Sequence, residues 1–376
     1  MAIPASRFGA SVTEIDSLQD LRAVLDSGRP LTGLRLQDLD LTTWAPELMR
    51  RTDVAGLVVL GGRLPAELDA HLRAQRALIF PTDPSAPVDP YRSTLYQPHE
   101  LYAGLEESGY EATPDYRAYS WTREAALRDD AFVTLLRAIH DHAITDALTE
   151  FIGDRPVAGV MGGHALARGT SGYAAAARLG RDLAAAGLVV MTGGGPGAME
   201  AANLGAFAGE DERLDRALSQ LAEVPSFRPS VGRWASVALR VHDDLFTAGR
   251  RQQVASVGVP TWFYGHEPPN VFCDGIGKYF SNAIREDGLL ARTTAGLVVL
   301  EGAAGTVQEI FQAVTPLYYA PVDGVLPPLV LVGERHWSHE VPVWPTLQAL
   351  GRERALGTVV HLVDTVEEAA EVLSAH

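Results

Sequence analysis

From about residue 155 onward, short apolar runs alternate with longer segments in which apolar residues recur every three to four positions. Short continuous apolar runs are typical of strands that are buried on both faces, and the longer segments are typical of amphipathic helices. The predicted strands are 157–161, 188–191, 259–264, 296–300, 329–332 and 359–362. The predicted helices are 173–186, 198–208, one within 237–253, 272–290, one that follows residue 306, about 345–355 and 365–375. This alternation predicts an α/β fold with a Rossmann-like, doubly wound parallel sheet and helices on both faces.

Residues 1 to about 125 form a separate pattern that predicts a smaller α/β unit. It contains a helix at 17–27, a strand at 54–60, a helix at 65–77 and a strand at 78–80. The segment 81–90 holds four prolines and is predicted to be a loop, and 91–119 shows no clear period. We therefore expect two domains: an N-terminal accessory unit at 1–125, suited to packing or dimer formation, and a Rossmann-like domain at 126–376.

Two further segments lie at the start of the second domain and within it. Residues 122–151 are predicted to form a long amphipathic helix or a pair of helices. Residues 209–235 are polar and irregular and contain Pro225 and Pro229, which predicts a lid or a surface loop.

Glycine-rich loops follow three of the predicted strands. The first is Gly162-Gly163, the second is GGGPGAME at 193–200, and the third is EGAAGTVQE at 301–309. A glycine turn that opens a helix leaves unpaired N–H groups pointing at the turn, and an anion is the favoured guest there. Such a loop can also simply reverse the chain. Because the carboxyl ends of parallel strands lie at one edge of a sheet, we expect the three loops to form one site.

Composition narrows the classes of partner. The 376 residues carry a net charge of −16, and 47% of them are hydrophobic. The acidic excess argues against a nucleic-acid polymer as the main partner, because binding one requires clustered basic side chains. No apolar run approaches the roughly 20 residues that span a bilayer, and the first residues lack a basic segment followed by an apolar one. We therefore expect no membrane association and a cytoplasmic location.

Few residues are available for metal or redox chemistry. Cys273 is the only cysteine and is expected to be a buried apolar residue. His140 and His142 lie two positions apart on a predicted helix and therefore on different faces. The HDD motif at 242–244 and the HWSH motif at 336–339 have no third matching ligand nearby in the sequence. We predict no metal site and no cofactor.

Common nucleotide motifs are absent from the sequence. It has no GxxxxGK[ST] motif, which excludes an ATP-hydrolysing phosphate loop. The GGGPGAM segment does not cleanly match the GxGxxG spacing of hydride-transferring dinucleotide enzymes.

The pair of motifs GGGPGAME and EGAAGTVQE resembles the LOG family, often labelled "lysine decarboxylase-like", whose signatures are GGGxxGLM and PGGxGTxxE. The resemblance covers about residues 155–376, including the DTVEEA segment at 364–369. This chain would be a long form with an extra N-terminal domain. Members of this type are phosphoribohydrolases that cleave nucleoside 5′-monophosphates into free base and ribose 5-phosphate. The resemblance implies a small-molecule nucleotide substrate and a homodimer.

Roles for individual residues follow from the resemblance alone. It implies that Glu309 is the catalytic carboxylate and that Arg285, on the preceding predicted helix, is the catalytic arginine. The implied phosphate-binding residues are Gly302, Gly305 and Thr306. The remaining implied substrate-binding residues are Gly162, Gly163, Gly193, Gly194, Gly195, Gly197 and Met199.

The chain departs from the family pattern at two positions. Glu301 stands in place of the proline, and Ala303 in place of the second glycine. A methyl group at 303 leaves phosphate binding possible. A carboxylate at 301 repels phosphate unless it points away or meets an arginine, for which Arg285 or Arg292 is suited.

The residue types also fit the reaction on chemical grounds. Cleavage of a C1′–N bond develops positive charge on the ribosyl ring and negative charge on the leaving base. A carboxylate such as Glu309 can stabilise the ring or deprotonate there, and Arg285 can assist departure or anchor the substrate. The simpler interpretations are a solvated helix-face glutamate and a surface salt bridge from Arg285 to Glu286 or Asp287.

Two other functions stay open. One is a non-catalytic nucleotide-binding or nucleotide-sensing protein, which the altered loop at 301–303 favours. The other is amino-acid decarboxylation, which requires pyridoxal phosphate on a lysine. Lys278 is the only lysine and lies on a predicted helix outside both glycine loops. The GHEPPN segment at 265–270 either lines a base pocket or forms a proline-stiffened loop.

Overall fold

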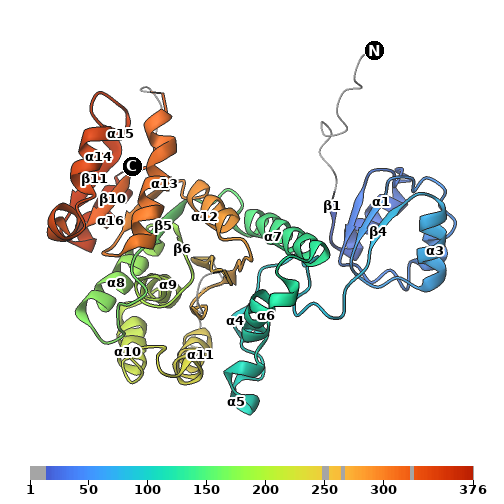
Figure 1. The fold of residues 1–376 in the computed structure, drawn as a ribbon, viewed down its shortest axis with the longest axis horizontal. Helices are drawn as coiled ribbons and strands as arrows, with labels where there is room; N and C mark the ends of the chain where they lie inside the picture. Colours follow the sequence, from blue (N-terminus) through green and yellow to red (C-terminus); the bar gives the residue numbers. More distant parts are fainter. Residues whose placement is uncertain (1–13, 248–253, 264–266, 322–325, 376) are drawn as a thin grey trace. The chain divides into compact units, whose positions relative to one another are not determined.

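The computed structural model describes residues 14–247, 254–263, 267–321 and 326–375. The chain divides into two compact units, drawn in Figure 1. The smaller unit comprises Met1–Thr94 and Leu135–Asp146, and the larger comprises Leu95–Thr134 and Ala147–His376. The division therefore falls earlier in the chain than the expected boundary near residue 125.

The smaller unit is built on a four-stranded parallel sheet in the order β1-β2-β3-β4. Apolar side chains of the sheet and of two helices form its core, among them Leu21, Leu36, Val59 and Leu72, all almost fully buried. The predicted helices at 17–27 and 65–77 and the predicted strand at 78–80 are confirmed, and the strand within 54–60 begins later than expected. The elements are β1 (Glu14–Ile15), α1 (Leu18–Asp26), β2 (Arg35–Gln37), α2 (Ala45–Leu48), β3 (Val58–Leu60), α3 (Ala66–Ala74) and β4 (Leu78–Phe80).

The larger unit has a seven-stranded sheet in the order β11-β10-β9-β5-β6-β7-β8, with every pair parallel. The chain runs outward from β5 to β8, returns to the other side of β5 at β9, and runs outward again to β11. The predicted Rossmann-like, doubly wound sheet is therefore confirmed. The strands are β5 (Val157–Met161), β6 (Val189–Thr192), β7 (Ser256–Gly258), β8 (Gly275–Ile276), β9 (Gly296–Val299), β10 (Leu329–Val332) and β11 (Val360–Val363).

Helices cover the larger sheet. Helices α8, α9 and α16 pack together and on β6 and β10, whereas α12 and α13 form a separate pair. Helices α8 and α9 approach so closely that a side-chain carbon at Gly205 would lie 1.7 Å from the carbonyl oxygen of Ala177. The principal helices of the larger unit are α6 (Pro114–Arg123), α8 (Ser171–Ala185), α9 (Ala198–Ala208), α10 (Asp211–Leu221), α11 (Val231–Thr247), α12 (Asn282–Ala291), α13 (Ala304–Tyr319), α14 (Trp344–Leu350) and α16 (Val366–Ser374). Helix α7 (Ala131–Ile152) is divided between the units, because its residues 135–146 belong to the smaller one.

Short helical turns complete the larger unit. They are α4 (Pro98–Leu101), α5 (Leu105–Ser108), η1 (Tyr110–Ala112), η2 (Ala125–Leu127), the π-helical turn η3 (His336–Glu340) and α15 (Leu356–Val359). Within the described ranges, no helix is long and apolar enough to cross a membrane.

Three sequence predictions in the larger unit are wrong. The strand expected at 259–264 is β7, which ends at Gly258 because Pro260 follows and cannot donate to a ladder. The helix expected at 272–290 is divided: β8 comes first, and α12 begins after Ser281, whose hydroxyl accepts the Ile284 amide. The segment 209–235 is not irregular throughout, because α10 buries Leu214, Ala217 and Leu221. Residue 264 of the expected strand, and residues 248–253 of the segment 237–253 in which a helix was expected, lie outside the described ranges.

Candidate functional site

A cavity of about 1130 Å³ opens at the carboxyl end of the larger sheet. Its walls come from the segments that follow β5, β6, β7, β9, β10 and β11, and from α8, α12 and α13. The strand order reverses at β5, between β9 and β6. Open α/β sheets bind ligands at this kind of reversal, so the fold places the cavity where a binding site is expected.

The cavity brings together the predicted site residues with two exceptions. Those in its wall are Gly162, Gly163, Gly193, Gly195, Met199, Arg285, Gly302, Gly305, Thr306 and Glu309. The exceptions are Gly194 and Gly197, which shape the second loop instead. Gly194 has a φ of +69°, and a side-chain carbon there would lie 2.5 Å from the ring of Pro260. Gly197 packs against the backbone of Gly163 and caps α9.

Arg285 and Glu309 meet in the cavity wall. Arg285 Nη1 lies 3.4 Å from Glu309 Oε1, and Arg285 Nη2 donates to Asn282 Oδ1 at 3.0 Å. A side-chain carbon at Gly193 would lie 3.6 Å from Arg285 Nη1, so the GGGPG loop reaches the same guanidinium. Both side chains are largely buried, Arg285 with 10% and Glu309 with 15% of its side chain exposed. Glu309 is therefore not a solvated glutamate on a helix face. The expected ion pair of Arg285 with Glu286 is present, with Nη2 3.8 Å from Glu286 Oε1, but both of its side chains are buried.

Two features of this pair point toward a bound group. Arg285 Nε is buried and has no hydrogen-bond partner among the described residues. Buried donors are normally satisfied, so this unpaired N–H is an exception in a residue of the cavity wall. Burial raises the pKa of Glu309, and the opposite charge of Arg285 offsets only part of that effect.

Helix ends add positive potential to the cavity. The first turns of α13 and α9 have no side-chain cap, whereas α8 is capped by Thr170 and α16 by Thr365. The first turn of α13 also lacks an acidic residue, whereas α9 carries Glu200 there. An uncapped N-terminus retains N–H groups for an anion, so α13 is the better anion site of the two.

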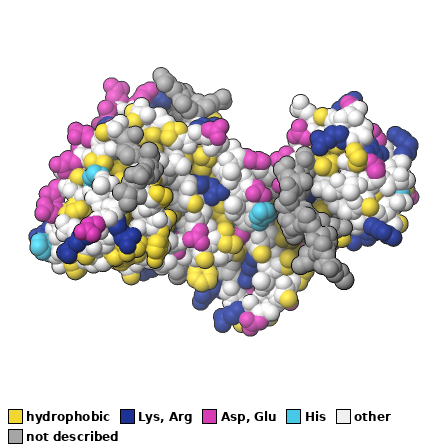
Figure 2. Space-filling model, turned by 90° about the horizontal axis from the view of Figure 1, so that it is seen from above, with side chains coloured by type: hydrophobic (Ala, Val, Ile, Leu, Met, Phe, Trp, Pro, Cys, Tyr) yellow, Lys and Arg dark blue, Asp and Glu magenta, His cyan; other side chains and the backbone are white. Residues whose placement is uncertain are grey.

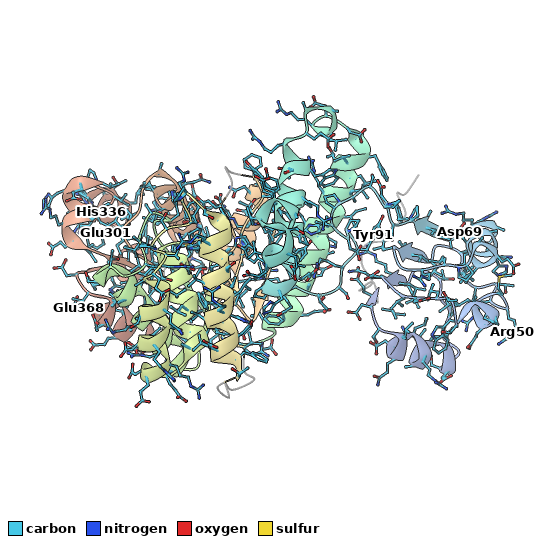
Figure 3. The ribbon with its side chains drawn as sticks, turned by 90° about the horizontal axis from the view of Figure 1, so that it is seen from below. Arg50, Asp69, Tyr91, Glu301, His336 and Glu368 are labelled. Atoms are coloured by element: carbon cyan, nitrogen blue, oxygen red, sulfur yellow. The ribbon has the colours of Figure 1, made fainter. Side chains whose placement is uncertain are left out.

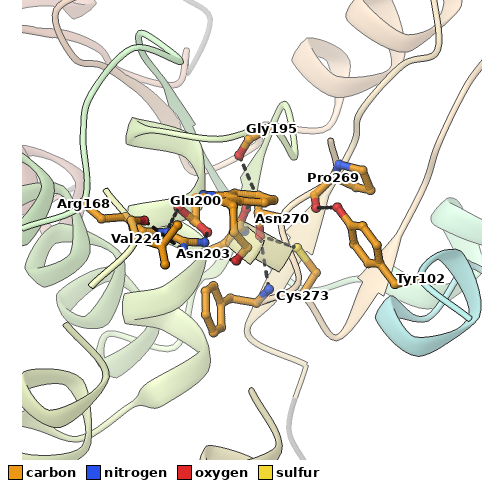
Figure 4. Close-up of polar contacts among 11 residues, drawn as sticks. Tyr102, Arg168, Gly195, Glu200, Asn203, Val224, Pro269, Asn270 and Cys273 are labelled. Atoms are coloured by element: carbon orange, nitrogen blue, oxygen red, sulfur yellow. Dashed lines mark hydrogen bonds and ion pairs between the residues drawn. The ribbon is translucent and has the colours of Figure 1, made fainter. Parts of the chain in front are cut away.

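A buried polar network holds the GGGPG loop in place (Figure 4). The Asn270 amide donates to Gly195 O at 3.1 Å and to Asn203 Oδ1 at 3.0 Å, and its backbone N–H donates to Gly194 O at 2.8 Å. Thr192 Oγ1 donates to the same Asn203 Oδ1 and accepts the Gly194 amide. Asn270 therefore positions the loop. In the same GHEPPN segment Glu267 lines the cavity, and Gly265 and His266 lie outside the described ranges.

A buried ion pair fixes the start of α9, also visible in Figure 4. Glu200, the last residue of GGGPGAME, receives two hydrogen bonds from Arg168, of which Nε to Oε2 is 2.9 Å long. Both side chains are 1% exposed, and the Arg168 guanidinium lies 4.5 Å from the Trp234 ring centre. Sequence reasoning missed this pair, because a glutamate in the first turn of a helix is usually solvated.

A histidine that follows β10 contacts the loop after β9. His336, the first residue of η3, donates from Nε2 to Gly302 O at 3.0 Å. Glu301 lies beside His336 (Figure 3). One of its carboxylate oxygens approaches Gly333, because a side-chain carbon added at Gly333 would lie 3.1 Å from that oxygen. Arg285, one of the two partners expected for Glu301, pairs instead with Glu309. Glu301 is thus turned toward the end of β10.

Acidic groups outnumber basic ones in the cavity wall. The carboxylates are Glu267, Glu286, Glu301, Glu309, Asp364 and Glu367, and the basic groups are Arg285, His164 and His336. One of these carboxylates has a polar neighbour, because His164 Nδ1 lies 3.2 Å from Glu267 Oε1. On the face drawn in Figure 2 acidic side chains are also spread over the surface, in keeping with the net charge of −16.

Four further residues that the sequence analysis considered lie outside the cavity. Cys273 is a buried free cysteine, as expected. Lys278 does not lie on a helix: it follows β8, is fully buried, and donates to Asp115 Oδ1 at 2.6 Å. It is not among the cavity residues, which leaves no lysine there for pyridoxal phosphate among the described residues. His140 is buried beside Asp141, and His142 is exposed beside Asp146.

The fold and the cavity together define an α/β protein with a Rossmann-like sheet and a ligand cavity at its carboxyl end. No family model matches the chain, and no curated protein matches it. Several solved structures resemble it in fold, and three of them align with 59% of its length. They are a molybdenum cofactor carrier protein from Chlamydomonas reinhardtii (17% identity, TM-score 0.35, 99% of that chain), TM1055 (19%, 0.34, 99%) and a molybdenum cofactor binding protein from the phototrophic bacterium Rippkaea orientalis (16%, 0.34, 98%).

Proposed function

We propose that the protein hydrolyses the N-glycosidic bond of a nucleoside 5′-monophosphate and releases free base and ribose 5-phosphate. The observation that carries this proposal is the Arg285–Glu309 pair, which lies in one cavity wall with both glycine loops. The resemblance of the two loops to the LOG signatures supports the same reaction. A cavity of about 1130 Å³ also leaves room for a nucleotide and for the attacking water.

In the proposed reaction the C1′–N bond breaks, the water oxygen adds to C1′ and the departing base receives a proton. The phosphate is placed at the uncapped start of α13, beside the Thr306 hydroxyl. The ionised Glu309 carboxylate stabilises the positively charged ribosyl ring or accepts the proton of water. The unpaired Nε–H of Arg285 then donates to the base as negative charge develops on it, or anchors the substrate.

A second candidate function is nucleotide binding without catalysis. Glu301 and Ala303 alter the phosphate loop, and the carboxylates of the cavity wall oppose a dianionic phosphate. The direction of Glu301 toward Gly333 reduces this repulsion at the loop. Both candidate functions predict nucleotide binding, but only the hydrolase predicts release of free base. One assay therefore separates them.

The assay incubates the protein separately with AMP, GMP, CMP and UMP and follows free base by chromatography. Nucleotide binding is measured in parallel by titration calorimetry. We expect free base from at least one of the four nucleotides. Binding without release of base from any of them would replace the hydrolase with the nucleotide-binding alternative.

The Glu309→Gln variant tests the role of the carboxylate. It should reduce kcat by about 10²-fold or more while nucleotide binding persists, because the amide keeps the shape and loses the charge. Glu371→Gln makes the same chemical change at an exposed position of α16 and should leave kcat unchanged. Full activity in Glu309→Gln would reject the assignment of this residue.

A further inference from the structure

Two histidines and an aspartate from distant parts of the chain meet on the larger unit, away from the cavity. His99 comes from α4, and His242 and Asp243 come from α11. Asp243 Oδ1 lies 2.8 Å from His99 Nε2 and 3.0 Å from His242 Nδ1. The three donor atoms all lie within 4.8 Å of one another. The HDD motif thus acquires the third ligand that its neighbourhood in the sequence lacks.

The separations of Asp243 Oδ1 from the two histidine nitrogens are close to those in a metal coordination shell, and the two nitrogens lie within 4.8 Å of each other. Metal–nitrogen bonds of about 2.0–2.1 Å in a tetrahedral site place neighbouring donors about 3.3 Å apart. The two distances from Asp243 Oδ1 fall a few tenths of an ångström below that value. A small outward movement of exposed side chains would admit an ion, since His99 and Asp243 have 56% and 54% of their side chains exposed.

The backbone on both sides of the cluster is held in place without a metal. On α11, the His242 ring stacks on Phe207 of α9 with ring centres 4.8 Å apart. On the α4 side, Gln97 donates to Asp274 O, and the Tyr102 hydroxyl donates to Pro269 O at 2.6 Å. The two helices that carry the three ligands are therefore already held close together before an ion binds.

We propose that His99 Nε2, His242 Nδ1 and Asp243 Oδ1 bind a divalent transition metal ion of the zinc class. Two imidazoles and one carboxylate suit Zn²⁺, Co²⁺ or Ni²⁺, whereas Mg²⁺ and Ca²⁺ prefer oxygen ligands throughout. Three protein ligands leave one position for water. The ion joins α4 to α11, so it fastens the segment that begins at Leu95 to the body of the larger unit. This site is independent of the proposed reaction.

The test uses the full chain after treatment with a chelator. Titration with Zn²⁺ by calorimetry and with Co²⁺ by visible absorption should show one tight site per chain, with the d–d bands of four-coordinate Co²⁺. Saturating Zn²⁺ should raise Tm, because a ligand that binds only the folded state stabilises it. His99→Ala and Asp243→Asn should each weaken the binding of both ions by about tenfold or more and abolish the rise in Tm.

His142→Ala is the matched control. His142 is an exposed histidine 3.3 Å from Asp146, and no third ligand joins that pair among the described residues. This variant should bind both ions as the parent does. The proposal is overturned if the parent shows no Co²⁺ bands, or if His99→Ala binds Zn²⁺ and Co²⁺ as tightly as the parent. Because His99 is exposed, the metal-free Tm of His99→Ala shows whether its fold is intact.

Discussion

Glu309 sits where two physical effects on one carboxyl group oppose each other. Burial in the cavity wall disfavours the ionised form, and Arg285 favours it. The net effect raises the pKa of Glu309 above its ordinary value of 4.5. The proposed chemistry needs the ionised form, so the environment of this residue sets the acid limit of activity.

We therefore predict that the acid limb of the kcat/KM profile lies above pH 4.5. Below the raised pKa the carboxyl group is protonated and can neither stabilise a ribosyl cation nor accept a proton from water. Initial rates measured from pH 4 to pH 8 on the nucleotide that is turned over provide the profile. Activity that holds constant down to pH 4 would contradict the role of an ionised Glu309.

Asp38 of the smaller unit is a second carboxyl group with a raised pKa. Burial, the charge of Asp89 and a hydrogen bond to Asp89 raise the pKa of Asp38 to about 6. Its backbone also has a φ of +50°, a conformation that asparagine tolerates better than most residues. Ionised Asp38 thus costs stability above pH 6, and this cost vanishes once the group is protonated in both states, below its unfolded value of 3.8.

We predict that Asp38→Asn stabilises the smaller unit at pH 7. The gain in the free energy of unfolding should be about 1 kcal/mol, because the group is half exposed and solvent screens part of the effect. The gain should shrink as the pH falls through 6 toward 4. Denaturant titrations of the parent and the variant at pH 7 and at pH 4 measure this gain. Asp40→Asn is the control of opposite sign, since hydrogen bonds from Thr42 lower the pKa of Asp40 and are weaker when an uncharged amide oxygen accepts them.

At the scale of elements, the ion pair of Arg168 and Glu200 joins the start of α9 to the segment between α10 and α11. Arg168 also donates to Val224 O and Trp234 O. Since the pair is almost fully buried, removal of one partner leaves an uncompensated charge inside the protein.

We predict that Glu200→Gln lowers the free energy of unfolding by about 3 kcal/mol. Glu223→Gln, at an exposed position nearby, should change it by less than about 0.5 kcal/mol. Urea denaturation of both variants makes the comparison. The apolar double variant Arg168→Met with Glu200→Leu should be more stable than Glu200→Gln, and an equal or larger loss in the double variant would contradict this account.

The elements predicted correctly from the sequence are those whose burial follows one period. Val157–Met161 and Leu329–Val332 are buried along their whole length, and the apolar runs marked them directly. The segment around Gly275 failed because the apolar residues before and after β8 also fit a helical period. The α10 helix was missed because Pro225 and Pro229 dominated the interpretation, although its apolar face lies entirely before them.

For the candidate site, the glycine loops and the adjacent charged residues were visible in the sequence, and their neighbours were not. Glu309 was predicted from the second motif and Arg285 from its place on the helix before that motif, both through the family resemblance, and the structure brings them within 3.4 Å. The support from Asn270 and His336 depends on contacts between separate loops. No local pattern distinguishes such a contact from an ordinary polar side chain.

At the scale of the whole molecule, residues 95–134 belong to the larger unit. Buried hydrogen bonds connect this segment to later parts of the chain. Asp115 of α6 accepts hydrogen bonds from Lys278 Nζ, from Trp262 Nε1 and from the Tyr110 hydroxyl. Asp115 and Lys278 are both fully buried. Nothing in the sequence indicated that residues 95–134 belong to the larger unit, because the sequence does not distinguish a buried aspartate from an exposed one.

We predict that a chain truncated to residues 126–376 is markedly less stable than one truncated to 95–376. The shorter chain lacks Asp115 and leaves the Lys278 ammonium buried without its carboxylate, a loss of about 3–5 kcal/mol. It also lacks the hydrogen bond from Tyr102 to Pro269. Thermal unfolding of both chains tests the division, and equal values of Tm would favour a boundary near 125.

The burial of Lys278 also has a chemical consequence. It is the only lysine in the sequence, so its amine is the only side-chain amine that acylating reagents can modify. In the folded protein that amine is shielded from solvent and bonded to Asp115. Acylation of Lys278, followed by mass spectrometry, should therefore proceed only when this interior opens. The rate at which Lys278 is acylated would thus report the opening of the larger unit, and no label has to be introduced into the protein.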